Sequence, residues 1–304
     1  MDYKKTIEVL EKQNLEIIRL RRETRISDFF SKLSFDTKSF NYIMNVFIKK
    51  KISKTINRNF VVFRDEENRN NVEMIADRQY VDDKKIVVYT CITGNYDNIP
   101  ELTFLDEDID YYLFTDQEPE TVTWKTKRIP DYITYLQDNV LINRYLKMHP
   151  FELFEDKYDI AIYIDGNVDI TSDIKPWSQY VTDKTGLAFH RHFQRDCLYQ
   201  EAEVLKLYKK GNATAIDEQI QRYKKVGFPI NYGLPEATVI VSDLNNLNSK
   251  KVFNQWWEEF IKTGSFRDQL SLPYVLWKNN ILVSEVTKLG KNLYRSAKIS
   301  VKSH

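Results

Sequence analysis

The stretch around residue 165 combines the pattern of a buried strand with a set of oxygen ligands. Residues 160–164 form a nearly continuous apolar run, which is typical of a strand covered on both faces of a mostly parallel sheet. Asp165 stands at the carboxyl end of this run, and Asn167 and Asp169 follow at alternate positions. Alternate residues of an extended chain point the same way, so we expect these three side chains to converge. Such oxygens would bind Mn2+ or Mg2+ together with substrate phosphates. The alternative is a solvated turn, in which Asp and Asn are ordinary residues.

The composition excludes several classes of protein. The chain of 304 residues carries 45 Lys and Arg against 44 Asp and Glu, so no global basic field favours nucleic acid as a partner. Cys91 and Cys197 lie far apart, which argues against a disulfide framework or a structural zinc site and favours a reducing cytosol. The charged N-terminus lacks the apolar core of a secretory signal. We expect a cytoplasmic protein that can rest at the inner face of a membrane.

The first part of the chain, residues 1–80, is predicted to be a helical extension. Apolar residues near helical spacing predict helices over about 3–25 and 35–56, and Asn14 falls where a coiled-coil seam would place an apolar side chain. The first sixty residues hold fourteen Lys and Arg against seven Asp and Glu. This excess favours contact with an anionic membrane or self-association through residues 1–60, and the alternative is a solvated extension. The polar segment 64–71 is the candidate linker.

Residues 81–304 are predicted to form one α/β domain. Helical patterns alternate with short apolar or alternating runs, and this order predicts a Rossmann-like, mixed but mostly parallel sheet flanked by helices. Sites in such sheets lie at the carboxyl ends of the strands. The basic tail after Thr287 is expected to order only on binding. The predicted strands are 86–92, 111–114, 123–129, 160–164, 186–189 and 238–241, and the predicted helices are 139–154, 197–210, 215–226, 252–262 and 268–277.

Several of these stretches, taken in order, resemble glycosyltransferases of the GT-A type and, more narrowly, the proteins of domain-of-unknown-function family 616. The resemblance covers about residues 85–281 and implies a GT-A-like fold. It also implies transfer of a sugar from a nucleotide-sugar donor to a hydroxyl of a glycan or lipid-linked glycan, in cell-surface polysaccharide synthesis. Asn167 departs from the common Asp-x-Asp pattern and, being neutral, would hold Mn2+ or Mg2+ less strongly. The matching pieces are 89–97, 114–116, 143–149, 163–167, 195–202, 233–236 and 267–270.

The resemblance assigns donor contacts to the loop after the first strand and to one helix. Tyr96 would stack on the base, and Asp116 would accept a hydrogen bond from base or ribose. Arg144 and Lys147 lie one helical turn apart and would add positive charge at the diphosphate. For these residues a packed surface aromatic and a solvated helix face are the alternatives. The expected donor contacts are Thr93, Gly94, Tyr96, Asp116, Arg144, Lys147 and Asp165.

On the acceptor side, an inverting transferase needs a carboxylate base near the attacking hydroxyl. Asp268, at a predicted helix start, is the favoured base, with an N-terminal cap as its alternative. Glu236 is the second candidate. The expected acceptor contacts are His190, His192, Arg195, Glu201 and Gln269, although a solvated loop would equally suit the two histidines.

Two other classes of function remain. A non-catalytic carbohydrate-binding or scaffold protein could keep the fold, and Asn167 is the feature that supports it. A metal-dependent hydrolase would use the acids, but the sequence lacks a His-rich ligand set.

Overall fold

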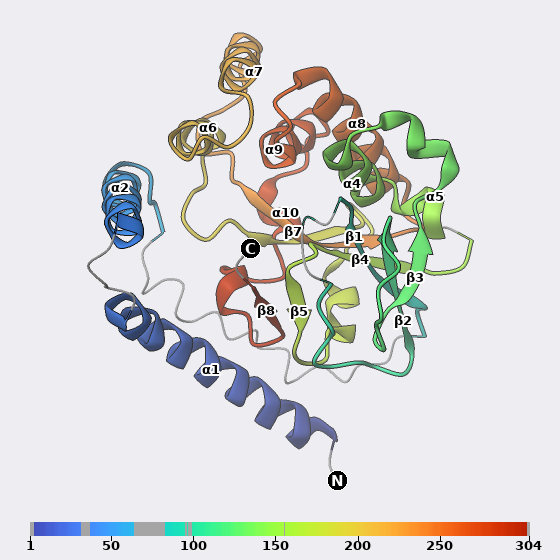
Figure 1. Cartoon of the computed structure of the whole chain (residues 1–304). Helices are drawn as coiled ribbons and strands as arrows, with labels where there is room; N and C mark the ends of the chain where they lie inside the picture. The colour runs from blue at the N-terminus through green and yellow to red at the C-terminus, as the bar shows by residue number, and fades with distance from the viewer. Residues whose placement is uncertain are drawn as a thin grey trace.

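The computed structural model describes residues 3–31, 37–63, 83–94, 96, 99–154 and 156–302. Its centre is a six-stranded sheet with the order β3-β2-β1-β4-β7-β6 (Figure 1). From β3 to β4 the neighbours pair in parallel, whereas β7 is antiparallel to both β4 and β6. The predicted α/β fold with a mixed, mostly parallel sheet is confirmed. The strands are β1 (Ile86–Ile92), β2 (Ile109–Thr115), β3 (Lys125–Arg128), β4 (Ile160–Ile164), β6 (Leu187–Arg191) and β7 (Pro235–Asp243).

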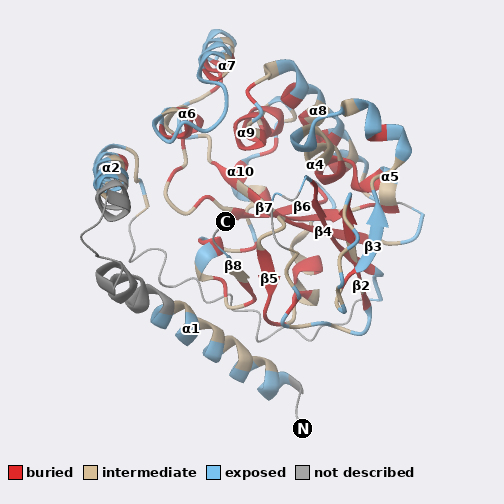
Figure 2. Cartoon of the chain, in the orientation of Figure 1, coloured by how far each residue is buried: buried red, intermediate tan, exposed pale blue. Residues whose placement is uncertain are grey.

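Both faces of the sheet are covered, and for this reason its central strands are apolar throughout (Figure 2). On β1, Val87 and Tyr89 face one apolar cluster and Ile86 and Val88 face the other. The first cluster includes side chains of five α-helices, and the second includes Trp177 and a small second sheet. The five helices are α4 (Asn139–Met148), α5 (Pro150–Phe154), α8 (Leu247–Thr263), α9 (Asp268–Lys278) and α10 (Val283–Val286). The predicted helix 139–154 is thus two helices, divided at His149 just before Pro150.

A helical hairpin extends from the same side of the domain. It consists of α6 (Leu198–Leu207) and α7 (Ala213–Lys225), both of which were predicted with similar bounds. A third apolar cluster joins the hairpin to α9, and in it the ring of Tyr223 stacks on that of Tyr274 with 4.0 Å between centroids. The hairpin is therefore packed against α9.

The prediction that the C-terminal tail orders only on binding is wrong for its described part. Strand β8 (Ile299–Val301) pairs antiparallel with β5 (Val168–Ile170), and Leu289 and Leu293 are buried beneath the sheet. The apolar residues of the tail are widely spaced among lysines, so no period marks them. The partner strand β5 is only three residues long, which is too short to be recognised from the sequence pattern.

Helices α1 (Tyr3–Ser31) and α2 (Thr37–Asn59) confirm the two predicted N-terminal helices. The predicted linker 64–71 lies outside the described residues. The Asn14 amide donates to the carbonyls of Thr171 and Ala297, at 2.9 and 3.0 Å, so it anchors α1 to the β5–β8 side of the domain. Among the described residues, no helix is long and apolar enough to cross a membrane.

Replacing Asn14 by Ala should loosen α1 from the domain. Each lost hydrogen bond is worth about 1 kcal/mol net, so the substitution should speed amide hydrogen exchange in α1 and leave the sheet protected. The control is Lys12→Ala on the exposed side of α1. Equal exchange in both variants would contradict this anchoring.

Candidate active site

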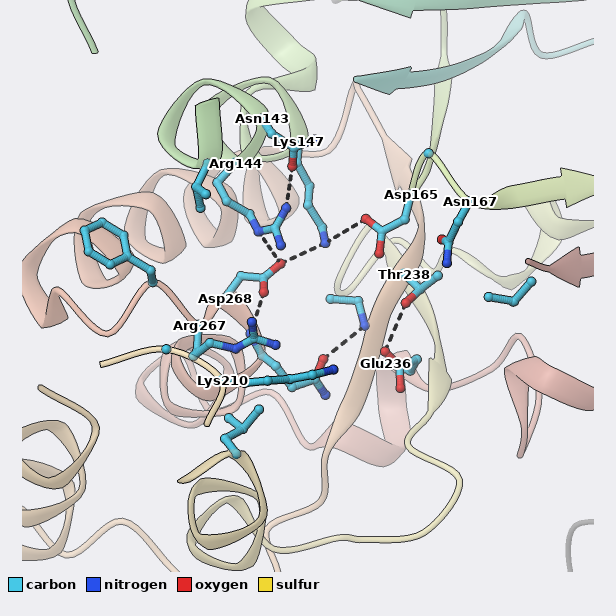
Figure 3. Close-up of a pocket in the computed structure, with 18 of the residues that line it drawn as sticks. Asn143, Arg144, Lys147, Asp165, Asn167, Lys210, Glu236, Thr238, Arg267 and Asp268 are labelled. Carbon is cyan, nitrogen blue, oxygen red and sulfur yellow. Dashed lines mark hydrogen bonds and ion pairs between the residues drawn. The ribbon is translucent and has the colours of Figure 1, made fainter. Parts of the chain in front are cut away.

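A cavity of about 900 Å³ lies at the carboxyl ends of the parallel strands, where the sequence predicted the site. Its walls come from the loop after β1, from α4, from the ends of β4 and β6, from the start of β7, and from the starts of α9 and of the α6–α7 turn (Figure 3). Because β7 is antiparallel, its first residues meet the end of β4, and the Asp165 N–H donates to the Thr238 carbonyl at 2.9 Å. The predicted residues that line the cavity are Thr93, Tyr96, Arg144, Lys147, Asp165, Asn167, His192, Arg195, Glu201, Glu236, Asp268 and Gln269.

Two cations of α4 form a buried charge cluster at this edge. The Asp138 side chain caps α4 by accepting from the N–H groups of Val140 and Leu141. The Lys147 side chain is only 2% exposed, and its Nζ lies 2.8 Å from Asp268 Oδ2 and 3.4 Å from Asp165 Oδ1. Arg144 Nε lies 3.1 Å from the same Asp268 oxygen. The pair therefore faces the cavity and not bulk solvent.

Asp268 does not have the properties of a base, contrary to the favoured prediction. Burial alone would raise the pKa of its carboxyl, but the positive charges of Arg144, Lys147 and Arg267 outweigh burial and hold the pKa below its usual range. One carboxylate oxygen is occupied by two cations, and the other accepts from the Gln269 N–H at 3.1 Å. Asp268 is also not the N-cap of α9, because that position is held by Arg267 without a side-chain cap. Its carboxylate serves as the counter-ion that allows Lys147 to be buried.

Asp268→Asn should therefore destabilise the protein, because Arg144 loses its carboxylate partner and Lys147 keeps only the more distant one, Asp165. Breaking a buried pair costs about 3–5 kcal/mol. The lowered pKa means that this contribution is present above the ordinary carboxyl pKa and fades as pH falls below it. Chemical denaturation at pH 7 and at pH 3 should show the deficit shrinking at the lower pH. A normal midpoint at pH 7 would contradict the counter-ion assignment.

Glu236, unlike Asp268, has the properties of a general base. Burial, with a contribution from the charge of Glu201, raises the pKa of Glu236 to about 7. The Thr238 hydroxyl donates to its carboxylate at 3.1 Å. The Gln269 amide holds the backbone on both sides of Glu236. Its Nε2 donates to the Pro235 carbonyl, and its Oε1 accepts from the N–H of Ala237. A base is most effective when its pKa is near the working pH. Glu236 therefore has the pKa of a suitable general base, and Gln269 holds its backbone in position.

Turnover should rise with pH through about 7 and then level off, because Glu236 must lose its proton to act. Glu236→Gln should lower the rate by about a hundred- to ten-thousand-fold. Since the folded pKa is raised, the carboxyl stabilises the fold at low pH and loses that contribution as pH rises towards 7. The Gln variant should gain in melting temperature, relative to the native protein, between pH 5 and pH 8. A flat pH–rate profile in the native protein would remove Glu236 from this role.

The predicted acceptor residues divide between the cavity and the core. Arg195 Nε lies 2.6 Å from Glu201 Oε2, and both side chains line the cavity as a buried pair. His192 Nδ1 accepts from the Arg195 N–H at 3.1 Å. Burial, followed by the charge of Arg195, holds the pKa of His192 well below its usual value, so this ring is neutral.

His190 does not reach the cavity, so its predicted acceptor contact is corrected. The side chain is fully buried, and its ring lies edge-on to Trp177 with 5.7 Å between centroids. The expectation assumed that strand alternation would continue to His192. However, β6 ends at Arg191 and the chain then turns.

The predicted donor loop is built around Gly94. Its φ is +65°, and a Cβ there would lie 2.2 Å from Asn139 Nδ2, so a side chain would strain the backbone and displace Asn139. The Gly94 N–H donates to the Asp116 carboxylate at 2.9 Å. Asp116 thus braces the loop from outside the cavity, which corrects its predicted contact with base or ribose. Tyr96 lines the cavity and is 77% exposed, so its ring is accessible to a ligand.

The structure does not bring the three predicted metal ligands together. The Asp169 carboxylate accepts from the N–H and hydroxyl of Thr103, at 2.8 and 2.9 Å, and does not line the cavity. The Asn167 amide donates to the Lys302 carbonyl at 2.9 Å. Within the described ranges, no group of three or more His, Cys, Asp or Glu could hold a metal. The residues present fit a cation only if a substrate's phosphates complete its shell around Asp165.

The cavity-lining residues that sequence reasoning did not name as site residues include Lys210, Arg267 and Tyr294. Arg267 stands beside Asp268 in a stretch that carried the resemblance, which was an available signal. Tyr294 lies in the tail that was expected to be unordered, and Lys210 follows a helix end that carries no motif.

The structure is thus that of an α/β protein with a cavity at the carboxyl edge of its sheet. The chain is a member of the TOD1/MUCI70 glycosyltransferase-like domain family, whose model matches residues 22–297. The match begins within α1, so part of the N-terminal region that was expected to lie outside the resemblance is included. Comparison with curated proteins gave no match.

Among solved structures, three similar ones are glycosyltransferases. The bifunctional glycosyltransferase WbbM is 14% identical with a TM-score of 0.42, over 69% of this chain and 39% of that one. GlyE of Streptococcus pneumoniae TIGR4 is 12% identical with a TM-score of 0.37, over 64% and 43%. Mouse xyloside xylosyltransferase 1 is 8% identical with a TM-score of 0.40, over 72% and 97%. The chain thus spans about two fifths of the first two, and such distant likenesses bear on neither substrate nor mechanism.

Proposed function

We propose that this protein transfers a sugar from a nucleotide-sugar donor to a hydroxyl of a glycan acceptor. The observation that carries the proposal is a single cavity with Glu236, whose pKa is about 7, on one strand and the Arg144–Lys147 pair on a facing helix. Glu236 is suited to removing the proton of the acceptor hydroxyl, and Arg144 and Lys147 are suited to neutralising the negative charge of the donor diphosphate. Membership of a glycosyltransferase-like family supports this pairing. The narrower kinship with family 616 is part of the proposal.

The donor would lie along the loop after β1. Its base would stack on Tyr96, and its diphosphate would face Arg144 and Lys147. Glu236 would take the proton of the acceptor hydroxyl as that oxygen attacks the anomeric carbon. The bond from this carbon to the diphosphate oxygen would break, and its electron pair would leave on the nucleoside diphosphate. Attack opposite to the leaving group inverts the anomeric configuration.

A divalent cation, Mn2+ or Mg2+, would be shared between Asp165 and the donor. Bound there, it would supply Lewis-acid stabilisation of the leaving diphosphate. Asn167 would add a neutral oxygen at most, since its amide nitrogen is already engaged with the Lys302 carbonyl. Arg144 and Lys147 of α4 lie on the same side of the cavity as Asp165 and would help to neutralise the charge of the diphosphate.

The cellular setting is also proposed on chemical grounds. The acceptor would be a glycan or lipid-linked glycan of a cell-surface polysaccharide. The basic excess of residues 1–60 would bring the enzyme to the inner face of an anionic membrane or to a second copy of the chain.

Asp165→Ala should abolish Mn2+-dependent binding of nucleoside diphosphate in calorimetry, while the fold survives. The matched control is Asp169→Asn, which removes the carboxylate four residues after Asp165, at a position that does not line the cavity. This variant should bind nucleotide normally and lose stability through Thr103. Equal affinity in both variants would contradict the placement of the diphosphate. Normal binding by the native protein without any turnover would favour the carbohydrate-binding alternative.

A further inference from the structure

We propose that Lys210 and Arg267 form an anion subsite on the acceptor side of the cavity, for a phosphate or carboxylate group carried by the acceptor. This inference rests on the proposed function, because it presumes an acceptor in the same cavity. It adds that the acceptor is a charged glycan and not a neutral one.

The two side chains come from elements that meet at one wall. Lys210 follows the end of α6, and Arg267 is the residue that precedes α9. Both line the cavity, and in Figure 3 they extend from the α6 and α9 side towards its centre. Burial raises the pKa of Glu201, and the charges of Arg195, Arg267 and Lys210 oppose this rise, so the two cations act on the same part of the cavity as Glu201.

What distinguishes this pair is the lack of an ion-pair contact among the described residues, although the charge of Arg267 acts on Asp268 and Glu201 from a distance. The other cations of the cavity are neutralised: Arg144 and Lys147 by Asp268, and Arg195 by Glu201. Within the part of the chain that the structure describes, neither Lys210 nor Arg267 makes an ion pair, and the buried Nε of Arg267 has no hydrogen-bond partner. A buried donor without a partner is unfavourable, because it has lost its hydrogen bonds to water. A ligand oxygen would remove that cost.

The α6–α7 turn is shaped to hold the Arg267 side chain in place. Gly211 has a φ of +81°, and a Cβ there would lie 2.8 Å from the Ser265 carbonyl oxygen and 3.0 Å from Cγ and Cδ of Arg267. The glycine therefore lets the turn pack directly against the aliphatic stem of the arginine. A guanidinium held in this way is preorganised for two parallel hydrogen bonds to a phosphate or carboxylate.

The position favours the acceptor over the donor. The proposed diphosphate site is served by α4, which lies beside the loop after β1. Lys210 follows α6, and Arg267 packs against Gly211 of the α6–α7 turn while its charge also acts on Asp268. The pair would therefore meet the part of an acceptor that extends from Glu236 towards α6. Arginine and lysine together would select phosphate or carboxylate over an uncharged hydroxyl group.

The test titrates two probes, inorganic phosphate and a methyl glucuronide, into the full chain with and without saturating nucleoside diphosphate. Calorimetry should show at least one probe binding, and binding should persist when nucleotide is present. The probe that binds identifies the source of the anion as phosphate or uronate. Arg267→Gln and Lys210→Met should each weaken this binding by about tenfold or more. The control Lys209→Met removes one equal charge from an exposed neighbour outside the cavity and should change nothing.

Three outcomes would overturn the subsite. They are the absence of binding by both probes, equal affinity in the native protein and both variants, and displacement of the probe by nucleotide, which would give these cations to the donor. Melting curves of the two variants verify that each is folded, and the two variants perturb different elements. Failure of the proposed function is read separately, as the absence of nucleoside diphosphate binding to the native protein.

Discussion

The burial of one ammonium group constrains the whole candidate site. Lys147 is almost completely removed from water, and its Nζ lies 5.1 Å from the centre of the Tyr163 ring. An unpaired charge in such a place would cost several kcal/mol or more. It is tolerated because Asp268 and Asp165 provide carboxylates from α9 and from the end of β4. These ion pairs therefore hold α4, α9 and the end of β4 together at the wall of the cavity.

The second constraint is the reversal of chain direction at β7. In a fully parallel sheet the start of this strand would lie at the opposite edge, far from Asp165. Antiparallel pairing with β4 brings Glu236 and Thr238 to the carboxyl edge. Two carboxylates thus lie near each other in different surroundings. Asp165 faces a cation, whereas Glu236 is held by a hydroxyl and raised in pKa by burial. Such divergence is how neighbouring acids acquire separate tasks.

Much of the fold could be predicted because local patterns were strong. The apolar run of β1 gave its bounds, 86–92, without error, and the position of Asp165 at the end of β4 followed from the same kind of pattern. The direction of β7 could not be predicted, because a buried apolar run looks the same in either orientation. The tail after Thr287 was also missed, since its few apolar residues acquire meaning only against β5.

Most residues of the candidate site could be predicted from the sequence, but the role of each residue could not. Sequence placed Asp268 at a helix start, and this is correct, but its partner Lys147 is 121 residues away in the chain. No local pattern reveals the ion pair between Asp268 and Lys147. For this reason the sequence alone favours Asp268 as the base. The same limitation applied to His190 and Asp169, whose contacts with Trp177 and Thr103 are made across the fold.

The most direct test of the central claim is a crystal structure of the native protein with Mn2+ and the nucleoside diphosphate that raises its melting temperature most. The account predicts diphosphate density between Asp165 and the Arg144–Lys147 pair, with the base against Tyr96 and the Glu236 carboxylate facing the open acceptor side. Nucleotide bound elsewhere on the molecule, or a diphosphate directed away from α4, would contradict it.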